Sequence, residues 1–385
     1  MVKLKDICEK IGSGATPRGG KEAYCETGVS LIRSQNVLDY AFSADGLAHI
    51  NEEQAEKLKN VTVEDNDVLI NITGDSVARV CMVDKKHLPA RVNQHVCIIR
   101  AKQKIVMPSY LLYFLQMNKE YLLQMASGGA TRNALTKEML NNIELHLPPV
   151  DKQKKIVALL DNIQEKIKLN SEINNNLLEQ AQALYNQYFP YSISDDLPDG
   201  WRIGSVSEII EIYDSKRIPL SGAERMSMEN KIYPYYGAAS LMDYVDNFIF
   251  DGKYLLLGED GTVVDDLGYP ILQYVWGQFW VNNHAHVLTG KCGFNVESLY
   301  MLFKRTPVKS IVTGAVQQKI SQANLRSIQI VIPPEATLIE YNTQIEPLFA
   351  LLRTNEEENS SLSTLRDTLL PKLMNGDIDV STIQL

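Results

Sequence analysis

Two long segments of the chain repeat apolar residues at helical spacing. The first follows Pro148-Pro149 and carries apolar or small residues every three or four positions from Ile156 to Tyr188. This unbroken spacing predicts a helix over residues 151–189 with a coiled-coil seam, and Asp151 is placed to cap its N-terminus. At about 1.5 Å per residue such a helix is about 58 Å long.

The second segment repeats the pattern from Tyr341 to Leu373. Pro347 falls inside it. Because proline lacks the backbone N–H that a helix interior needs, we expect this second helix to be kinked or delayed there.

Two asparagines interrupt each seam: Asn170 and Asn174 in the first, Asn355 and Asn359 in the second. If the helices pack antiparallel, Asn170 faces Asn359 and Asn174 faces Asn355. A buried Asn pair lowers stability and fixes register, which is the role we expect here. The alternative is that these side chains face solvent on ordinary amphipathic helices.

An internal repeat relates the two halves of the chain. The block from Gly129 to Pro149 returns 185 positions later, from Gly314 to Pro334, and the offset continues into both helical segments. Two shorter blocks repeat upstream at offsets of 187 and 189: Val68-Leu69-Ile70 with Leu255-Leu256-Leu257, and Val92-Asn93-Gln94-His95 with Val281-Asn282-Asn283-His284. Several blocks repeated in one order indicate a structural repeat.

The repeat predicts an α+β fold. We expect two similar mixed α/β globular domains in tandem, separated and joined by two long helices that form an antiparallel coiled coil with pseudo-two-fold symmetry. The expected boundaries are a globular domain over 1–147, a helical region over 148–189, a globular domain over 190–332 and a helical region over 333–385.

Composition supports a globular protein of the cytoplasm. The 385 residues are 45% hydrophobic and 22% charged, and no apolar run approaches the roughly 20 residues of a membrane span. The five cysteines form no CxxC pair, so we expect reduced, core-packed thiols. The net charge is −9, and residues 333–385 carry nine acidic against three basic side chains. This balance argues against non-specific coating of nucleic acid.

The doubled motifs resemble a known family, the specificity subunit of type I restriction-modification systems. The resemblance covers essentially the whole chain. One departure is that Gln153 has no counterpart after Pro334, which leaves the start of the second helix open. The motifs that carry the resemblance are Gly129-Ala130-Thr131 with Leu135-Thr136, leading into Leu147-Pro148-Pro149 and Gln153; Gly314-Ala315, leading into Ile332-Pro333-Pro334; Leu197-Pro198-Asp199-Gly200-Trp201; and Leu370-Pro371-Lys372-Leu373 with Gly376-Asp377-Ile378.

The resemblance implies a DNA-reading subunit with no catalytic activity of its own. Each globular domain becomes a target-recognition domain that reads one half of a bipartite, asymmetric site on double-stranded DNA. The helical regions bind two methyltransferase (modification) subunits, and the full complex adds restriction subunits. No cofactor is expected on this chain, because S-adenosylmethionine, ATP and Mg belong to the partners.

Base reading requires polar side chains on loops or helix starts that can reach a groove. In the first domain the candidates for DNA contact are Arg18, Arg33, Gln35, Asn36, Arg79, Thr131, Arg132 and Asn133. In the second domain they are Lys216, Arg217, Gln317, Gln318 and Lys319. A solvated loop residue is the alternative interpretation of each.

Catalytic and metal-binding motifs are weak in this sequence. Both double prolines lack the flanking amide or acid and the aromatic residue of an adenine-methyltransferase loop. His284 and His286 share a strand face, but the sequence places no Cys, Asp or Glu cluster beside them, so we expect structural roles and no metal. Asp260, Asp265 and Asp266 with Lys253 are better explained as loop residues than as a nuclease cluster.

Two other classes of function are open to test. A protein-interaction scaffold built on the coiled coil, binding no DNA, would suit the acidic balance. The polar, glycine-punctuated loop from Gly128 to Asn133 favours DNA binding instead. A free-standing methyltransferase or nuclease is disfavoured by the missing motifs.

Overall fold

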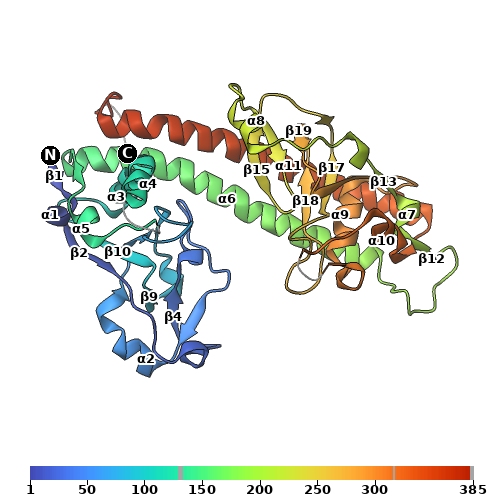
Figure 1. The fold of residues 1–385 in the computed structure, drawn as a ribbon, viewed down its shortest axis with the longest axis horizontal. Coiled ribbons are helices and arrows are strands. Elements are labelled where there is room, and N and C mark those ends of the chain that lie inside the picture. The colour runs from blue at the N-terminus through green and yellow to red at the C-terminus, as the bar shows by residue number, and fades with distance from the viewer. Residues whose placement is uncertain (129–132, 315–316, 382–385) are drawn as a thin grey trace. The chain divides into compact units, whose positions relative to one another are not determined.

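The computed structural model describes residues 1–128, 133–314 and 317–381. The chain divides into two compact units, Met1–Leu169 with Glu358–Leu385, and Asn170–Glu357. Each unit holds one globular part and a portion of each long helix (Figure 1). We call the globular parts head 1 (residues 1–147) and head 2 (residues 190–332).

The two long helices are α6 (Val150–Tyr188) and α11 (Glu335–Asn375). Asp151 lies in the first turn of α6, so the expected N-cap position was wrong by more than one residue. α11 begins directly after Pro334 and continues through Pro347. The expected delay of this helix was therefore wrong.

The departure at Gln153 has a structural explanation. Gln153 is fully buried, and its side-chain amide accepts a hydrogen bond from Met107 N and donates to the carbonyls of Ile105 and Pro148. At the equivalent position, 185 residues later, Leu338 is buried in the core of unit 2. A buried polar residue, Gln153, thus holds the start of α6, and a buried apolar residue, Leu338, holds the start of α11. Both helices begin at equivalent positions of the repeat, Val150 and Glu335.

The long helices run antiparallel within each unit. In unit 1, Lys166 Nζ lies 3.0 Å from Glu358 Oε2, and Arg366 donates to Gln164 Oε1 at 2.9 Å. In unit 2, the Tyr188 hydroxyl donates to Glu340 at 3.0 Å. As the residue number rises along α6, from Gln164 to Lys166, the number of its α11 partner falls, from Arg366 to Glu358. The pairing is therefore that of an antiparallel coiled coil.

Head 1 is built on two sheets. The main sheet has the order β2-β10-β7-β8 with antiparallel neighbours, and the second has the order β3-β5-β4-β9-β6, in which β4 and β9 are parallel. A short pair, β1 with β11, closes the head. The strands are β1 (Val2–Lys3), β2 (Cys8–Ser13), β3 (Tyr24–Cys25), β4 (Val29–Ile32), β5 (Ala48–Ile50), β6 (Thr62–Val63), β7 (Val68–Asn71), β8 (Val80–Met82), β9 (Ala90–Val92), β10 (Val96–Ala101) and β11 (Glu144–Leu145).

Head 2 repeats this topology. Its main sheet has the order β13-β20-β17-β18, its second sheet has the order β15-β14-β19-β16 with β14 and β19 parallel, and β12 pairs with β21. The strands are β12 (Arg202–Ser205), β13 (Ile210–Ile212), β14 (Tyr233–Tyr236), β15 (Leu241–Val245), β16 (Phe250–Asp251), β17 (Tyr254–Gly258), β18 (Leu272–Val275), β19 (Gln278–Val281), β20 (Ala285–Gly290) and β21 (Gln329–Ile332).

The strand register matches the repeat found in the sequence. Asn71 pairs with Val96 in head 1, and Gly258 pairs with Ala285 in head 2. Gly258 lies 187 residues after Asn71, and Ala285 lies 189 residues after Val96, which are the two offsets of the sequence repeat. Two tandem mixed domains and two long helices confirm the predicted fold class.

Helix α3 of head 1 and helix α9 of head 2 each pack against the main sheet and the long helices. In unit 1 the core joins α3, the main sheet, Leu160 of α6 and Leu370 of α11; in unit 2 it joins α9 to Tyr185 and Tyr341. The head helices are α1 (Leu4–Ile7), α2 (Glu52–Lys57), α3 (Pro108–Met117), α4 (Lys119–Ser127), α5 (Lys137–Asn141), α7 (Val206–Ile209), α8 (Gly222–Met226), α9 (Val296–Lys304) and α10 (Gln322–Ser327).

Three of the five cysteines, Cys8, Cys81 and Cys97, are buried free thiols, as expected, whereas Cys25 and Cys292 are exposed free thiols. Among the helices in the described part of the chain, none is both long and apolar enough to cross a membrane.

Candidate nucleic-acid interface

In head 1, four separate segments meet at the end of strand β7. Ile72, just beyond the strand, donates its backbone N–H to His95 and accepts from Leu135 at 2.8 Å. Thr73 forms a β-bridge with Ala134. The fully buried Asn71 side chain donates to the Ser34 carbonyl at 2.9 Å. Backbone and side-chain hydrogen bonds therefore hold these loops together around one strand end.

These loops line a cavity of about 630 Å³. Three predicted DNA contacts, Gln35, Arg79 and Asn133, are among its lining residues, although they are far apart in the sequence. The full lining is Ser34, Gln35, Thr73, Gly74, Asp75, Ser76, Arg79, His95, Asn133 and Ala134. The cavity is thus rich in side chains that can hydrogen-bond to base edges.

Arg79 is the cationic side chain best placed in this cavity. It is half-buried, and no hydrogen bond or ion pair occupies its guanidinium among the residues that the structure describes. The preceding residue, Ala78, is fully buried with a φ of 65°. A left-handed alanine costs roughly 1–2 kcal/mol and persists only where the surroundings impose it. The β7–β8 loop is therefore held in a strained shape that presents Arg79.

The sequence search missed His95, which also lines the cavity. Gln94 Nε2 lies 2.9 Å from His95 Nε2, and Thr73 Oγ1 lies 2.5 Å from His95 Nδ1. Both ring nitrogens of His95 are therefore held by polar neighbours. The repeated Val92-Asn93-Gln94-His95 block was the signal that could have identified it.

Other head 1 candidates have structural partners. Asn36 is fully buried, accepts from Arg33 N, and donates to the carbonyls of Ser43 and Asp45 at 3.0 and 3.1 Å. Arg33 itself donates to the Gly46 carbonyl at 2.6 Å. The prediction that Asn36 contacts DNA is therefore wrong: Asn36 stabilises the turn that carries Gln35.

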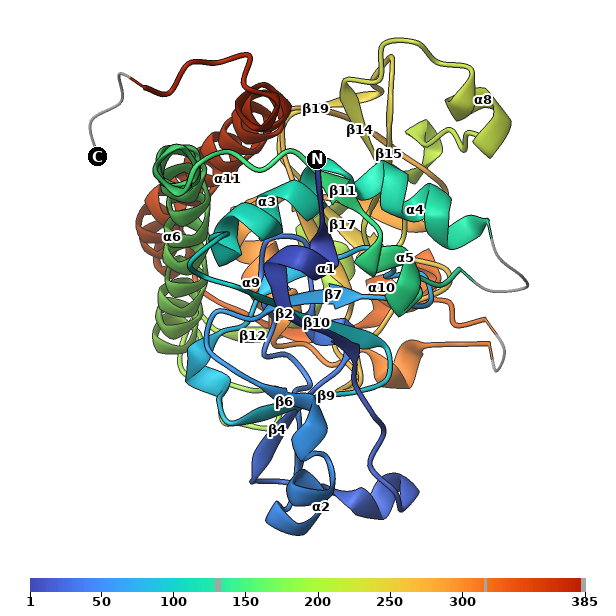
Figure 2. The same cartoon turned by 90° about the vertical axis from the view of Figure 1, so that its left-hand side faces the viewer.

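Arg18 lies elsewhere in head 1. It is exposed, and its carbonyl accepts from Gln54 of α2 at 3.0 Å. Figures 1 and 2 both place α2 at the end of head 1 away from α6. Arg18 does not line the cavity. Two further candidates, Thr131 and Arg132, fall outside the described residues.

Head 2 repeats the hydrogen-bonded frame at the end of β17. Glu259 donates its backbone N–H to His284 and accepts from Ile320, and Gly261 donates to Gln318 at 3.0 Å. Gln317, Gln318 and Lys319 are exposed on this edge. Of the five predicted contacts of head 2, Gln318 thus occupies the position that Asn133 occupies in head 1, with Gln317 and Lys319 on either side.

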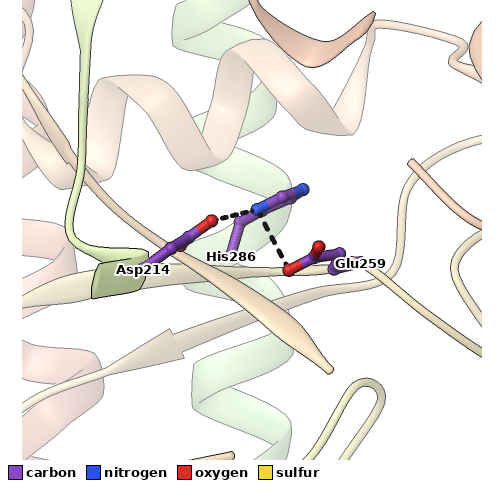
Figure 3. A group of neighbouring side chains, drawn as sticks. All are labelled: Asp214, Glu259 and His286. Atoms are coloured by element: carbon purple, nitrogen blue, oxygen red, sulfur yellow. Dashed lines mark hydrogen bonds and ion pairs between the residues drawn. The ribbon is translucent and has the colours of Figure 1, made fainter. Parts of the chain in front are cut away.

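A buried charged cluster lies beneath this edge (Figure 3). Asp214 follows β13, Glu259 follows β17 and His286 lies on β20; His286 Nδ1 is 2.6 Å from Asp214 and 3.6 Å from Glu259. The expectation that no acid stands beside His286 was wrong, because the fold brings together residues 72 positions apart. The half-buried His284 lies 3.7 Å from Asp260.

The cluster fits an ion network better than a metal site. One ligand atom from each of the three residues lies within 4.8 Å of the others. However, Arg217 donates to Glu259 at 2.6 Å and lies 3.4 Å from Asp214, so a guanidinium already supplies the positive charge. Arg217, nearly buried here, is corrected from a DNA contact to a member of this network.

The network also explains the acidity of Asp214. Burial alone would raise the pKa of its carboxyl group. Hydrogen bonds from His286 and Val287 and the charge of Arg217 outweigh that effect and lower the pKa below the ordinary value.

The remaining polar residues of head 2 have separate roles. Lys216 is exposed, with Nζ 5.1 Å from the Tyr213 ring centroid. Lys253 pairs with Glu297 and Glu346 at 2.7 and 2.9 Å rather than with the loop acids. Asp265 accepts from the backbone of its own loop, at Leu267 and Tyr269. A nuclease-like grouping of Lys253 with Asp265 is therefore not formed.

Comparison with known proteins identifies the class. The family "Type I restriction modification DNA specificity domain" matches residues 1–179 and 198–363. The specificity subunit of the type I restriction enzyme MjaIX from Methanocaldococcus jannaschii is 24% identical over 417 aligned positions, covering 100% of this chain and 94% of the relative. The HindI specificity subunit of Haemophilus influenzae is 19% identical, covering 91% and 94%.

A solved structure shares the fold. The type I restriction-modification S subunit from M. genitalium aligns with a TM-score of 0.56 at 16% identity, covering 97% of this chain and 95% of that one. The chain belongs to the type I restriction-modification DNA specificity family, and the resemblance seen in the sequence is confirmed. It is a DNA-recognition subunit and not itself an enzyme.

Proposed function

We propose that the two heads read the two halves of a bipartite, asymmetric DNA site. The observation that carries this proposal is the hydrogen-bonded loop frame shared by the ends of β7 and β17. The same frame carries different side chains: Gln35, Arg79 and Asn133 in head 1, and Gln317, Gln318 and Lys319 in head 2. Because base edges are discriminated by side-chain hydrogen bonds, different side chains select different half-sites.

The helical regions are the proposed docking sites for two methyltransferase subunits, with restriction subunits joining the full complex. Apolar side chains remain exposed on the helices, at Leu169 and Ile173 of α6 and at Ile339, Leu351 and Leu365 of α11. Exposed apolar residues along a helix suit a partner helix. On this proposal S-adenosylmethionine, ATP and Mg are bound by the partners, where methyl transfer and cleavage take place.

Mapping of methylated adenines tests the proposal. Genomic DNA from cells with and without this gene, both containing the methyltransferase, should differ at one bipartite motif with two unlike halves. Replacing head 1 by the head of a relative should change one half of the motif and leave the other intact. Identical methylation in the two strains would contradict the proposal and favour a scaffold that binds no DNA.

A further inference from the structure

Two of the residues under the head 2 loops, Glu259 and His286, stand where head 1 has uncharged residues. The pair Val96–Asn71 of head 1 is equivalent to the pair Ala285–Gly258 of head 2. The next residue of each strand is therefore equivalent too: His286 corresponds to Cys97, and Glu259 corresponds to Ile72. Cys97 and Ile72 are both buried. Head 1 therefore forms the same sheet with apolar residues at these two positions.

His286 is held at both ring nitrogens. Its side chain is fully buried, with Nδ1 2.6 Å from the Asp214 carboxylate and Nε2 2.8 Å from the Ile320 carbonyl. Both sides of the imidazole ring are thus bonded to oxygen atoms of the protein. Arg217 pairs with the carboxylates of both Asp214 and Glu259.

The network connects the loop that bears the predicted contacts Gln317, Gln318 and Lys319 to the loop that follows β17. His286 Nε2 lies 2.8 Å from the Ile320 carbonyl, and Asp214 accepts a hydrogen bond from the Gln322 side chain at 2.6 Å. Both contacts fix the position of the segment that directly follows Lys319. On the other side, Arg217 holds Glu259, which is followed by Asp260 and Gly261.

The two loops also meet each other at the surface. Lys319 Nζ lies 3.5 Å from Glu259 Oε1, and Asp260 forms a β-bridge with Lys319. One buried network thus fixes the mutual position of two exposed loops.

A buried ion network is costly as a stabilising device. Apolar residues of similar volume are often equally or more stabilising, because two charges must be removed from water. Directional hydrogen bonds instead define a geometry. His286 bonds Asp214 and the Ile320 carbonyl together only when the loop at Ile320 has one orientation.

We propose that Asp214, Arg217, Glu259 and His286 are positioning residues that set the specificity of head 2 for its half-site. This inference rests on the proposed function. It assigns to buried residues, rather than to the exposed loop alone, control over which bases Gln317, Gln318 and Lys319 reach.

The test uses the full chain in complex with its methyltransferase partner. DNA duplexes carry the bipartite site found by methylation mapping, with one base pair altered in either half. The double variant Glu259→Ile/His286→Cys installs the head 1 residues and leaves Asp214 paired with Arg217. We expect the variant to fold with a lowered unfolding midpoint, because Asp214 and the Ile320 carbonyl lose their bonds to His286. We also expect a roughly tenfold or greater loss of discrimination in the head 2 half-site and none in the other.

Two further variants complete the test. Gln322→Leu removes only an exposed amide that holds Asp214, so it should fold and give a smaller loss in the same half-site. Cys97→Ala at the equivalent place in head 1 should leave head 2 discrimination unchanged. If both head 2 variants fold and discriminate like the wild type, the positioning role is overturned. If the wild-type complex itself discriminates neither half-site, the proposed function fails instead.

Discussion

Asn355 Nδ2 donates a 2.8 Å hydrogen bond to Asn174 Oδ1 between α11 and α6 in unit 2. Asn174 in turn donates to Glu356 Oε1 at 2.8 Å. Both asparagines are buried. This is the pair that we expected for antiparallel helices. Asn174 and Asn355 therefore contact each other across the seam and do not face solvent.

The Asn174–Asn355 pair leads to a prediction about register. Asn174→Leu alone should lower the free energy of unfolding by about 1–3 kcal/mol, because the Asn355 amide loses its buried partner. Asn174→Leu/Asn355→Leu should instead be at least as stable as the wild type but permit helix slippage. Denaturant unfolding and cysteine cross-linking along the seam measure the two effects. A single cross-linking register in the double variant would contradict the role in register.

Arg79 should matter for DNA and not for folding. With its guanidinium unpaired among the described residues, Arg79→Ala should change unfolding by less than about 0.5 kcal/mol. In the complex with methyltransferase it should weaken binding to the mapped site by about 1–3 kcal/mol and relax selectivity in one half-site. Competition binding with single-base variants of the site measures both. Wild-type affinity in Arg79→Ala would remove Arg79 from the interface.

Asn36 is the matched control for Arg79. Asn36→Ala should destabilise unit 1 by about 1–3 kcal/mol, because the Arg33 N–H and the Ser43 and Asp45 carbonyls lose their shared partner. Its effect on DNA binding should follow only from the shifted turn at Gln35. Thermal unfolding of the two variants side by side separates the roles; an Asn36→Ala protein as stable as the wild type would refute the structural assignment.

Glu297 should be a major stabilising residue of unit 2. It is fully buried on α9, and it accepts from the Tyr274 hydroxyl at 2.6 Å and pairs with Lys253 and Arg353 at 2.7 and 3.2 Å. Glu297→Ala leaves these partners facing a cavity. We expect a loss of about 3 kcal/mol, since Glu346 still pairs with both cations. Denaturant titration measures it; a loss below about 1 kcal/mol would show that Glu346 suffices.

Asp214 predicts a pH dependence of stability. Its pKa lies below the ordinary 3.8 in the folded state, so the unfolded chain binds the proton more readily. The stabilisation is therefore complete above about pH 4 and is lost as the pH falls through the folded pKa. Asp214→Asn should be less stable at pH 7, and its deficit relative to the wild type should shrink on acidification. The exposed Asp246→Asn serves as the control, and a pH-independent deficit would contradict the linkage.

The isolated chain should bind DNA weakly. Head 2 has sixteen acidic and twelve basic residues over 190–332, and neutralisation of phosphates supplies most protein–DNA affinity. Tight, site-specific binding should appear only when the methyltransferase subunits are added. Fluorescence anisotropy at physiological salt, with and without partner, decides this. A nanomolar Kd for the chain alone would be incompatible with it.

The sequence by itself determined the architecture of this protein. Helical spacing over tens of residues and an offset of 185 between Gly129 and Gly314 are long, redundant signals, and they are sufficient for two heads and two antiparallel helices. The pairing of Asn174 with Asn355 followed from symmetry alone. Helix starts were less certain, because a buried Gln153 and a buried Leu338 can serve the same purpose.

Only the tertiary structure decided which polar residues belong to the candidate site. Gln35, Arg79 and Asn133 meet because hydrogen bonds at the end of β7 join three loops, and nothing local in the sequence encodes that meeting. Asn36 and Arg217 have the side-chain chemistry that base reading requires, yet burial and partners far along the chain give them structural roles. The physical reason is that hydrogen bonds and ion pairs depend on distances of a few Å, which a one-dimensional pattern does not contain.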